Sequence, residues 1–201
     1  MKKQIYLGAA YYPELWAEGE IEKDIARCKE TGINCLRVGE FAWGKMEEKE
    51  GMYDFAWLLR IVEKLWENDI ATVLCTPTAT PPRWMLNKYP EIRRVMPDLI
   101  RSDVSSRCHV CKSSETARIL NKRIVTEMAK AFSGVKGIIG WQIDNELFPY
   151  GDGCFCENCK KGFHSYLRDK FACIEKLNKA WGMSRWSLEY HSFEEVEPPY
   201  P

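Results

Sequence analysis

The chain has 201 residues, of which 45% are hydrophobic and 29% charged, so it is long enough to bury one sizeable core. Its 29 basic and 29 acidic residues cancel, which argues against nucleic acid as the main partner and leaves an uncharged substrate open. No apolar run approaches the ~20 residues of a membrane helix. The apolar start of the chain breaks at Pro13 and Glu14, so we read no export signal and expect a cytoplasmic protein without a membrane partner.

Apolar runs of strand length alternate along the chain with segments of helical periodicity. Strands are expected at 4–10, 34–38, 70–75 and 138–143. Helices are expected at 20–31, 55–67, 115–132 and 162–171. The charged run Glu47–Glu50 is interpreted as a solvated turn.

Continuous apolar strands separated by helices predict an α/β protein whose parallel sheet is covered on both faces. No glycine-rich phosphate loop follows any strand, which disfavours a nucleotide-binding fold. A (β/α)₈ TIM barrel is the leading architecture. Such barrels typically take ~250 residues, and only about the first four βα units are visible, so we expect residues 1–201 to form an incomplete part of one barrel domain.

Polar residues follow all four expected strands, at Tyr11–Glu14, Glu40–Trp43, Thr76–Thr80 and Asp144–Leu147, and the first two of these segments also hold aromatic residues. Working residues of a barrel lie at these strand ends. Sugar sites combine aromatic faces with carboxylates and amides, so the pattern favours a carbohydrate site. The alternative is that strand ends are polar because they meet solvent.

Trp141–Glu146 is the sharpest of these segments. A glutamate at the end of an apolar strand is expected to face a partly desolvated pocket, which raises a carboxyl pKa and suits a general acid. The neighbouring Asn145 is a candidate for bonding a substrate hydroxyl. An equally weighted alternative makes Asp144 or Asn145 a helix N-cap, with Glu146 complementing the helix dipole.

Three of the nine cysteines, Cys154, Cys156 and Cys159, have the tight spacing of thiolates that wrap one tetrahedral zinc ion. The fourth ligand stays open among Cys108, Cys111 and, more weakly, His109 and His164. The expected zinc-site loops lie within residues 108–159. The alternatives are reduced thiols without metal, or a redox pair at Cys108 and Cys111.

Four motifs together resemble the N-terminal part of a family 42 glycoside hydrolase, a retaining β-galactosidase: Tyr11–Trp16, Gly39–Trp43, Thr76–Trp84 and Gly140–Glu146. The resemblance covers nearly the whole chain in the right order. It implies a (β/α)₈ barrel that hydrolyses terminal non-reducing β-D-galactosyl residues.

The resemblance also implies roles for individual residues. Glu146 matches the acid/base, Asn145 the amide that contacts the sugar, and Arg107 the arginine of the galactose subsite. The family usually has a second basic residue where this chain has Cys108. The resemblance selects Cys111 as the fourth ligand of a structural zinc ion, beside Cys154, Cys156 and Cys159.

Retaining hydrolysis needs two carboxylates ~5–5.5 Å apart. In the family the nucleophile is a glutamate late in the barrel, so we expect it to be missing from these 201 residues. The resemblance therefore implies a partner, either a complementing C-terminal half or other copies in a homo-oligomer, since the family is often trimeric. The rival hypothesis is an inert, zinc-stabilised half-barrel that at most binds sugars or pairs with a partner.

Overall fold

The computed structural model describes residues 5–17, 19–103, 109–147 and 153–199. The chain divides into two compact units, which are described separately below. The first comprises residues 1–90, 106–108 and 119–148, and the second comprises residues 91–105, 109–118 and 149–201.

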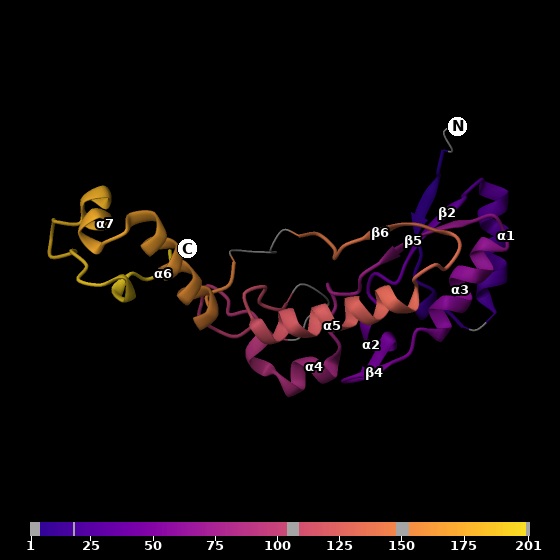
Figure 1. The fold of residues 1–201 in the computed structure, drawn as a ribbon, viewed down its shortest axis with the longest axis horizontal. Coiled ribbons are helices and arrows are strands. Elements are labelled where there is room, and N and C mark those ends of the chain that lie inside the picture. The colour runs from indigo at the N-terminus through magenta and orange to yellow at the C-terminus, as the bar shows by residue number, and fades with distance from the viewer. Residues whose placement is uncertain (1–4, 18, 104–108, 148–152, 200–201) are drawn as a thin grey trace. The chain divides into compact units, whose positions relative to one another are not determined.

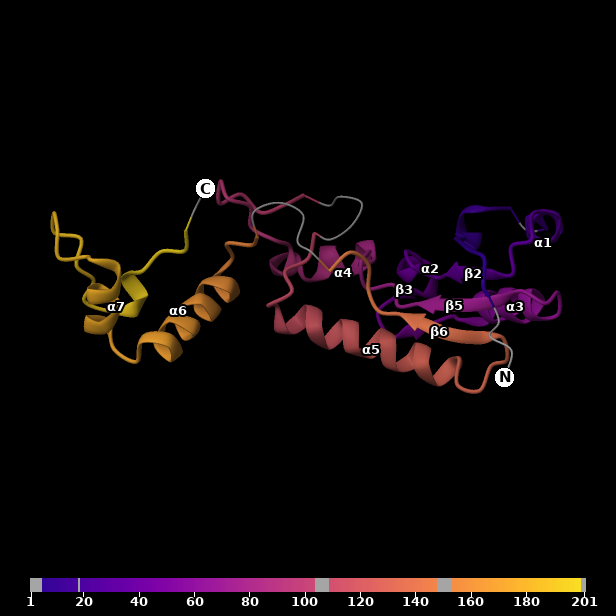
Figure 2. The ribbon, with the colours of Figure 1, turned by 90° about the horizontal axis from the view of Figure 1, so that it is seen from above.

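The first unit is built on a four-stranded parallel sheet in the order β1-β2-β5-β6 (Figure 1). Its strands are β1 (Gly8–Ala10), β2 (Cys35–Val38), β5 (Ala71–Cys75) and β6 (Ile138–Gln142). Figure 2 shows β5 and β6 side by side. One row of register partners crosses the whole sheet, through Ala10, Arg37, Val73 and Gly140. The structure thus confirms the α/β class, the parallel sheet and the presence of four strands, although β1 begins only at Gly8, later than expected.

Amphipathic helices follow the strands of the first unit. Helix α1 (Glu20–Thr31) buries Ile25 and Cys28 and ends at Gly32, which has a φ of 76° and returns its N–H to the carbonyl of Cys28. Helix α3 (Ala56–Trp66) buries Leu58, Val62 and Leu65 and packs against β5. Helix α5 (Glu115–Ala131) precedes β6, and its first turn belongs to the second unit. Among the described residues no helix is both long and apolar enough to cross a membrane.

The segment between β2 and α3 corrects one sequence-based interpretation. It forms α2 (Trp43–Met46) and an antiparallel pair of β3 (Glu47–Lys49) with β4 (Met52–Tyr53). Glu47 is only 2% exposed, so it does not belong to a solvated turn. Its carboxylate accepts the Trp43 Nε1–H at 2.7 Å and the Gly51 N–H at 2.8 Å, which makes its burial tolerable. Elsewhere in the chain, η1 (Pro13–Leu15) follows β1, and α4 (Arg83–Lys88) and η2 (Pro90–Ile92) follow β5.

The second unit contains α6 (Glu157–Phe171), α7 (Ile174–Trp181) and η3 (Phe193–Glu195). Helix α6 begins five residues earlier than the expected 162, because Cys156 adopts the extended N-cap conformation before Glu157. A small core joins the three elements through Leu167, Leu177, Phe193 and Val196. The buried Asn178 side chain bonds both backbone groups of Tyr190, at 2.7 and 3.1 Å, which fixes the return of the chain to this core.

Candidate active site and candidate metal site

A hydrogen-bonded network centred on Glu40 joins the carboxyl ends of β1, β2 and β6. Glu40 is 2% exposed, and its carboxylate accepts hydrogen bonds from Tyr12 Oη at 2.9 Å, Gln142 Nε2 at 2.5 Å and Arg37 Nη2 at 3.1 Å. Arg37 Nη1 also donates to Gln142 Oε1 at 2.6 Å. Burial and the Glu40 carboxylate raise the pKa of Tyr12. The polar residues at these strand ends therefore meet, as the parallel topology predicts.

The turn that carries Glu146 is attached to this network. The Asp144 N–H donates to Thr76 Oγ1 at 2.7 Å, and the Asp144 carbonyl accepts Gln142 Nε2 at 3.0 Å. Asp144 and Glu146 adopt φ values of 57° and 44°, in the left-handed region that non-glycine residues rarely occupy. Two such residues within three positions store backbone strain, which is common at functional sites. The hydrogen bonds of Asp144 with Thr76, which accepts, and with Gln142, which donates, hold the turn in this conformation.

Two expectations for Glu146 need correction. The sequence predicted that the Glu146 side chain faces a partly desolvated pocket, but in the structure this side chain is exposed. It is exposed because Glu146 follows β6, which is an edge strand of the described sheet. The helix N-cap alternative is also wrong for the described residues. Residues 143–147 are non-helical, and the next helix after them, α6, has Cys156 as its N-cap. The Asp144 carboxylate instead accepts the N–H of Asn145 at 2.8 Å.

Sequence reasoning missed Arg37 and Gln142, which join the strands beneath the turn. A signal was available for both. Each is the one strongly polar side chain in an otherwise apolar strand, Cys35–Val38 and Ile138–Gln142. A polar residue in such a strand needs a partner inside the fold, and each supplies one to the other.

Glu14, after β1, lies near the same strand ends. Burial raises its pKa, and the Glu40 carboxylate adds to this rise, whereas a backbone hydrogen bond and the charge of Lys45 lower the pKa by less. Its Oε2 atom is buried and has no hydrogen-bond partner. The expected subsite residue Arg107 and the candidate ligand Cys108 lie outside the described residues.

The structure brings four cysteine side chains into one cluster in the second unit, namely Cys111, Cys154, Cys156 and Cys159. Their sulfur atoms all lie within 4.8 Å of one another. Cys111 Sγ is 3.5 Å from both Cys156 Sγ and Cys159 Sγ. These separations are far beyond a disulfide bond and close to the about 3.8 Å between sulfurs on a tetrahedral zinc ion with Zn–S bonds of about 2.3 Å.

Backbone pairing of three segments assembles the cluster. The Cys111 N–H bonds the Ile92 carbonyl at 2.8 Å, and the Phe155 N–H bonds the Val95 carbonyl at 2.9 Å. Arg94 Nη2 donates to the Gly153 carbonyl at 2.6 Å. Residues 92–95 thus form a strap between the loop of Cys111 and the loop that carries the other three cysteines.

The thiols of the cluster shift one another's pKa. A hydrogen bond from Cys111 lowers the pKa of Cys154 to about 4, whereas burial raises the pKa of Cys159 to about 11. The hydrogen bond to Cys154 and burial raise the pKa of Cys111 as well. A soft divalent metal ion stabilises such a cluster because it binds all of the cysteines as thiolates.

The two histidines considered as ligands are not members of the cluster. His164 Nε2 lies 2.8 Å from the carbonyl oxygen of Val196, so this side chain forms a hydrogen bond at the small core of the second unit. His109 is buried, but its ring is not among the four ligand groups that lie together. Among the described residues the candidate metal site therefore consists of cysteines alone.

Known proteins match this chain along nearly its whole length. A family model described as Glyco_hydro_42, Beta-galactosidase, matches residues 10–201. The β-galactosidase YesZ of Bacillus licheniformis is 40% identical over 201 residues. The structure of a polyextremophilic β-galactosidase from the Antarctic haloarchaeon Halorubrum lacusprofundi superposes with a TM-score of 0.91 at 38% identity, over 98% of this chain. A β-galactosidase from Bacillus circulans sp. alkalophilus gives a TM-score of 0.91 at 34% identity, also over 98% of this chain.

The match covers a minor part of each relative. The chain accounts for 30% of Bacillus licheniformis YesZ and for 30% and 29% of the two solved chains. The chain therefore spans about 30% of the length of the relatives that it matches.

Proposed function

The chain belongs to the β-galactosidase family Glyco_hydro_42, and from this premise we propose that it is the N-terminal part of a (β/α)₈-barrel enzyme. The enzyme removes terminal non-reducing β-D-galactosyl residues with retention of configuration. The observation that carries the proposal is the placement of Glu146. It lies in a strained turn at the carboxyl end of β6, tied through Gln142 to the buried Glu40.

Glu146 acts as the acid/base in the proposed reaction. It protonates the departing glycosidic oxygen in the first step and deprotonates the attacking water in the second. Asn145 bonds a sugar hydroxyl from the adjacent position, and Arg107 lines the galactose subsite. The nucleophilic carboxylate, which must lie ~5–5.5 Å from the acid/base, is supplied by polypeptide outside these 201 residues.

The four-cysteine cluster is proposed to hold a structural zinc ion, in the loops within residues 108–159. Four thiolates complete a tetrahedral coordination sphere, so the ion keeps no open position for substrate or water. Its contribution is to fix the loops of Cys111 and Cys154–Cys159. The cysteines that the structure describes are free thiols, which supports the cytoplasm as the proposed compartment.

The proposed partner is the remaining part of the barrel, either on a complementing chain or through assembly with other copies. The rival function, an inert half-barrel that only binds sugars, requires that Glu146 be dispensable in the completed barrel. The two functions therefore differ in one measurable quantity, the rate lost when Glu146 is altered.

The test uses a chimera that joins this chain to the part of Bacillus licheniformis YesZ beyond its matched segment. We expect the chimera to hydrolyse a chromogenic β-galactoside. Glu146→Gln should lower kcat by about 10²- to 10⁴-fold, the usual contribution of general acid–base catalysis. The loss should be smaller for a substrate whose leaving group needs no protonation, because the first step then proceeds without the acid.

Glu48→Gln is the matched control, since Glu48 is an exposed glutamate on β3. It should leave kcat and KM unchanged. If the folded chimera with Glu146→Gln kept the parent rate, the acid/base assignment would be overturned. Inactivity of a folded chimera whose YesZ parent is active under the same conditions would favour the sugar-binding hypothesis.

A further inference from the structure

A pocket of about 510 Å³ lies between α1 and α3 in the first unit, and we call it the α1–α3 pocket. Helix α3 lines it with four side chains at helical spacing, which share one face of the helix: Trp57, Arg60, Ile61 and Lys64. This face is separate from the buried face of α3 that packs against β5. The first turn of α1, the segment between β1 and α1, and Lys45 of α2 line the rest.

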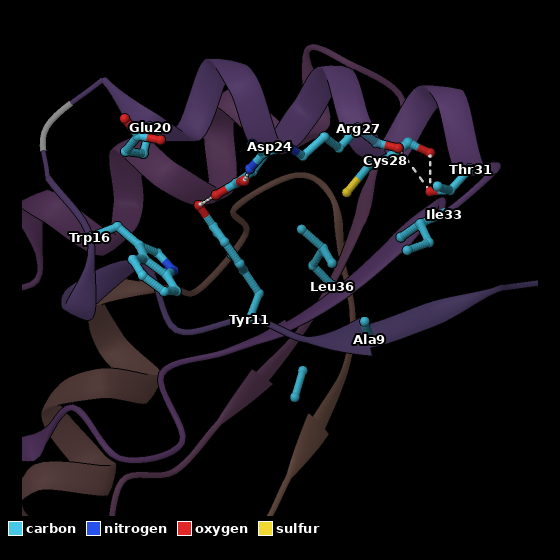
Figure 3. Close-up of a pocket in the computed structure, with 11 residues that line it drawn as sticks. Ala9, Tyr11, Trp16, Glu20, Asp24, Arg27, Cys28, Thr31, Ile33 and Leu36 are labelled. Atoms are coloured by element: carbon cyan, nitrogen blue, oxygen red, sulfur yellow. Dashed lines mark hydrogen bonds and ion pairs between the residues drawn. The ribbon is translucent and has the colours of Figure 1, made fainter.

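Two acidic side chains of α1 that meet lining residues of the pocket already have partners. Figure 3 shows Tyr11 reaching from the end of β1 to α1, where its hydroxyl donates to Asp24 Oδ2 at 3.0 Å. The other Asp24 oxygen accepts Arg27 Nη1 at 2.8 Å. Glu22 forms an ion pair with Lys64 of α3. The charges of Asp24 and Glu22 are therefore balanced by Arg27 and Lys64.

Two basic side chains of the pocket are not balanced in this way. In the described part of the chain, no ion pair joins Lys45 or Arg60 to an acidic side chain. The charge of Lys45 lowers the pKa of Glu14, but these two side chains are not close enough to form an ion pair. Lys45 Nζ instead lies over the Trp57 ring, 4.5 Å from its centroid. The pocket therefore carries two positive charges that an anionic ligand could balance.

Two indole rings line the same pocket. Trp16 is 57% exposed, so the face of its ring is accessible. Trp57 Nε1 is buried and has no hydrogen-bond partner. Buried donors in native proteins are nearly always paired, so this N–H points to an acceptor that the chain itself does not supply.

The chemistry of these groups defines the ligand. Aromatic faces pack against the C–H groups of a sugar ring, and arginine binds a carboxylate or a phosphate through two parallel hydrogen bonds. Lysine adds a second positive charge to the same anion. A ring with one anionic group meets all of these requirements.

We propose that the α1–α3 pocket binds a sugar that carries one carboxylate or phosphate group. Lys45 and Arg60 bind the anionic group, and the sugar ring packs against the Trp16 indole. A neutral galactoside lacks the anionic group and does not bind here. The proposal does not depend on the proposed function, because among the described residues neither the Glu146 turn nor the Glu40 network lines this pocket.

The test is isothermal titration calorimetry of the 201-residue chain with galacturonate, galactose 6-phosphate and neutral galactose as probes. We expect an anionic probe to bind, more weakly at higher ionic strength, and galactose not to bind. The tighter of the two anionic probes identifies the preferred group. Lys45→Gln and Arg60→Gln should each weaken binding by about tenfold or more. Lys136→Gln, at an exposed lysine of the same unit outside the pocket, is the control and should bind normally.

A spectroscopic readout locates the ligand. The indole N–H resonance of Trp57, assigned with Trp57→Phe, should shift when the anionic probe binds, because the group gains an acceptor. The same titrations on the chimera with Glu146→Gln measure binding without turnover.

Four results would overturn the proposal. They are the absence of binding by both anionic probes in a folded chain, equal binding of galactose, binding that Lys45→Gln and Arg60→Gln leave unchanged, and inorganic phosphate that binds as tightly as galactose 6-phosphate. The last result would mean that the sugar ring contributes nothing. An inactive chimera that still binds the anionic probe would leave this pocket standing and count against the proposed function instead.

Discussion

Replacing Gln142 by leucine tests the idea that one amide holds the candidate catalytic turn on the sheet. Gln142 accepts from Arg37 at 2.6 Å, donates to Glu40 at 2.5 Å and donates to the Asp144 carbonyl at 3.0 Å. Leucine has a similar volume and removes all three hydrogen bonds without opening a large cavity. The change therefore isolates the polar contribution of the side chain.

The magnitude follows from the burial of the two charged partners. A hydrogen bond to a charged group contributes about 1.5–3 kcal/mol to stability. Removing the bond destabilises the fold more when the group left without its partner is buried than when it is exposed. Glu40 is 2% exposed and loses a donor that water cannot easily replace, whereas the Arg37 side chain is 37% exposed and regains water. We expect Gln142→Leu to lower the free energy of unfolding by about 2–3 kcal/mol, mainly through Glu40.

Equilibrium urea unfolding followed by tryptophan fluorescence measures this loss, with hydrogen exchange at Asp144 as a local probe. Ile139→Leu, on the exposed face of the same strand, is the control and should change the unfolding free energy by less than about 0.5 kcal/mol. In the active chimera, Gln142→Leu should lower kcat more than it raises KM, because the turn that carries Glu146 loses a support. A Gln142→Leu protein as stable as the parent, with an unchanged Asp144 exchange rate, would show that this amide does not hold the turn.

Three further predictions concern the metal site, a close backbone approach and pH. Cys156→Ser should reduce bound zinc from about one to well below one ion per purified chain, measured by elemental analysis, because a structural site needs all four thiolates. Gly137→Ala should cost about 2–4 kcal/mol in urea unfolding, since Gly137 has a φ of 88° and a Cβ there would lie 2.9 Å from Trp66 Cβ. Burial raises the folded-state pKa of Glu14, so the folded state holds this proton more tightly. The contribution of Glu14 to stability is therefore present below its unfolded pKa and is lost as pH rises through the folded pKa, and Glu14→Gln should flatten that part of the stability–pH curve.

Each of these predictions has a control within the chain. Cys173→Ser alters a half-buried thiol outside the cluster and should keep the zinc content of the parent. Gly134→Ala has a φ of 74° but open space around its Cβ, so it should show the backbone cost without the steric one. Glu48→Gln should leave the pH dependence unchanged. Equal effects of Gly134→Ala and Gly137→Ala, or of Glu48→Gln and Glu14→Gln, would contradict the assigned causes.

The residue pattern predicts the local helices and strands of this chain. Helix α1 runs over the expected residues 20–31 because its apolar spacing and the glycine after it agree. The four strands follow from short apolar runs, and their parallel arrangement follows from the helices between them. The triple of Cys154, Cys156 and Cys159 is likewise a local signal, because close spacing brings thiols together in almost any loop.

The residue pattern does not predict which residues far apart in the sequence contact one another. Nothing near Cys111 in the sequence distinguishes it from Cys108, and the resemblance alone selected it. The structure places Cys111 in the cluster because its N–H pairs with Ile92, next to the strap that holds the loop of Phe155. Glu47 was misinterpreted for the same reason. Its four-residue charged run looks solvated, and only the fold brings Trp43 Nε1 and the Gly51 N–H to its carboxylate.

Periodicity and neighbours along the chain are enough to predict the class of fold, the strands in chain order and the segments that hold the candidate chemistry. They do not predict that Gln142, 102 residues from Glu40, bonds it and thereby supports the turn of Glu146, because this contact forms only in the folded sheet. Which buried polar groups satisfy one another depends on strand register. That register is set by the packing of the whole sheet rather than by any residue's immediate neighbours.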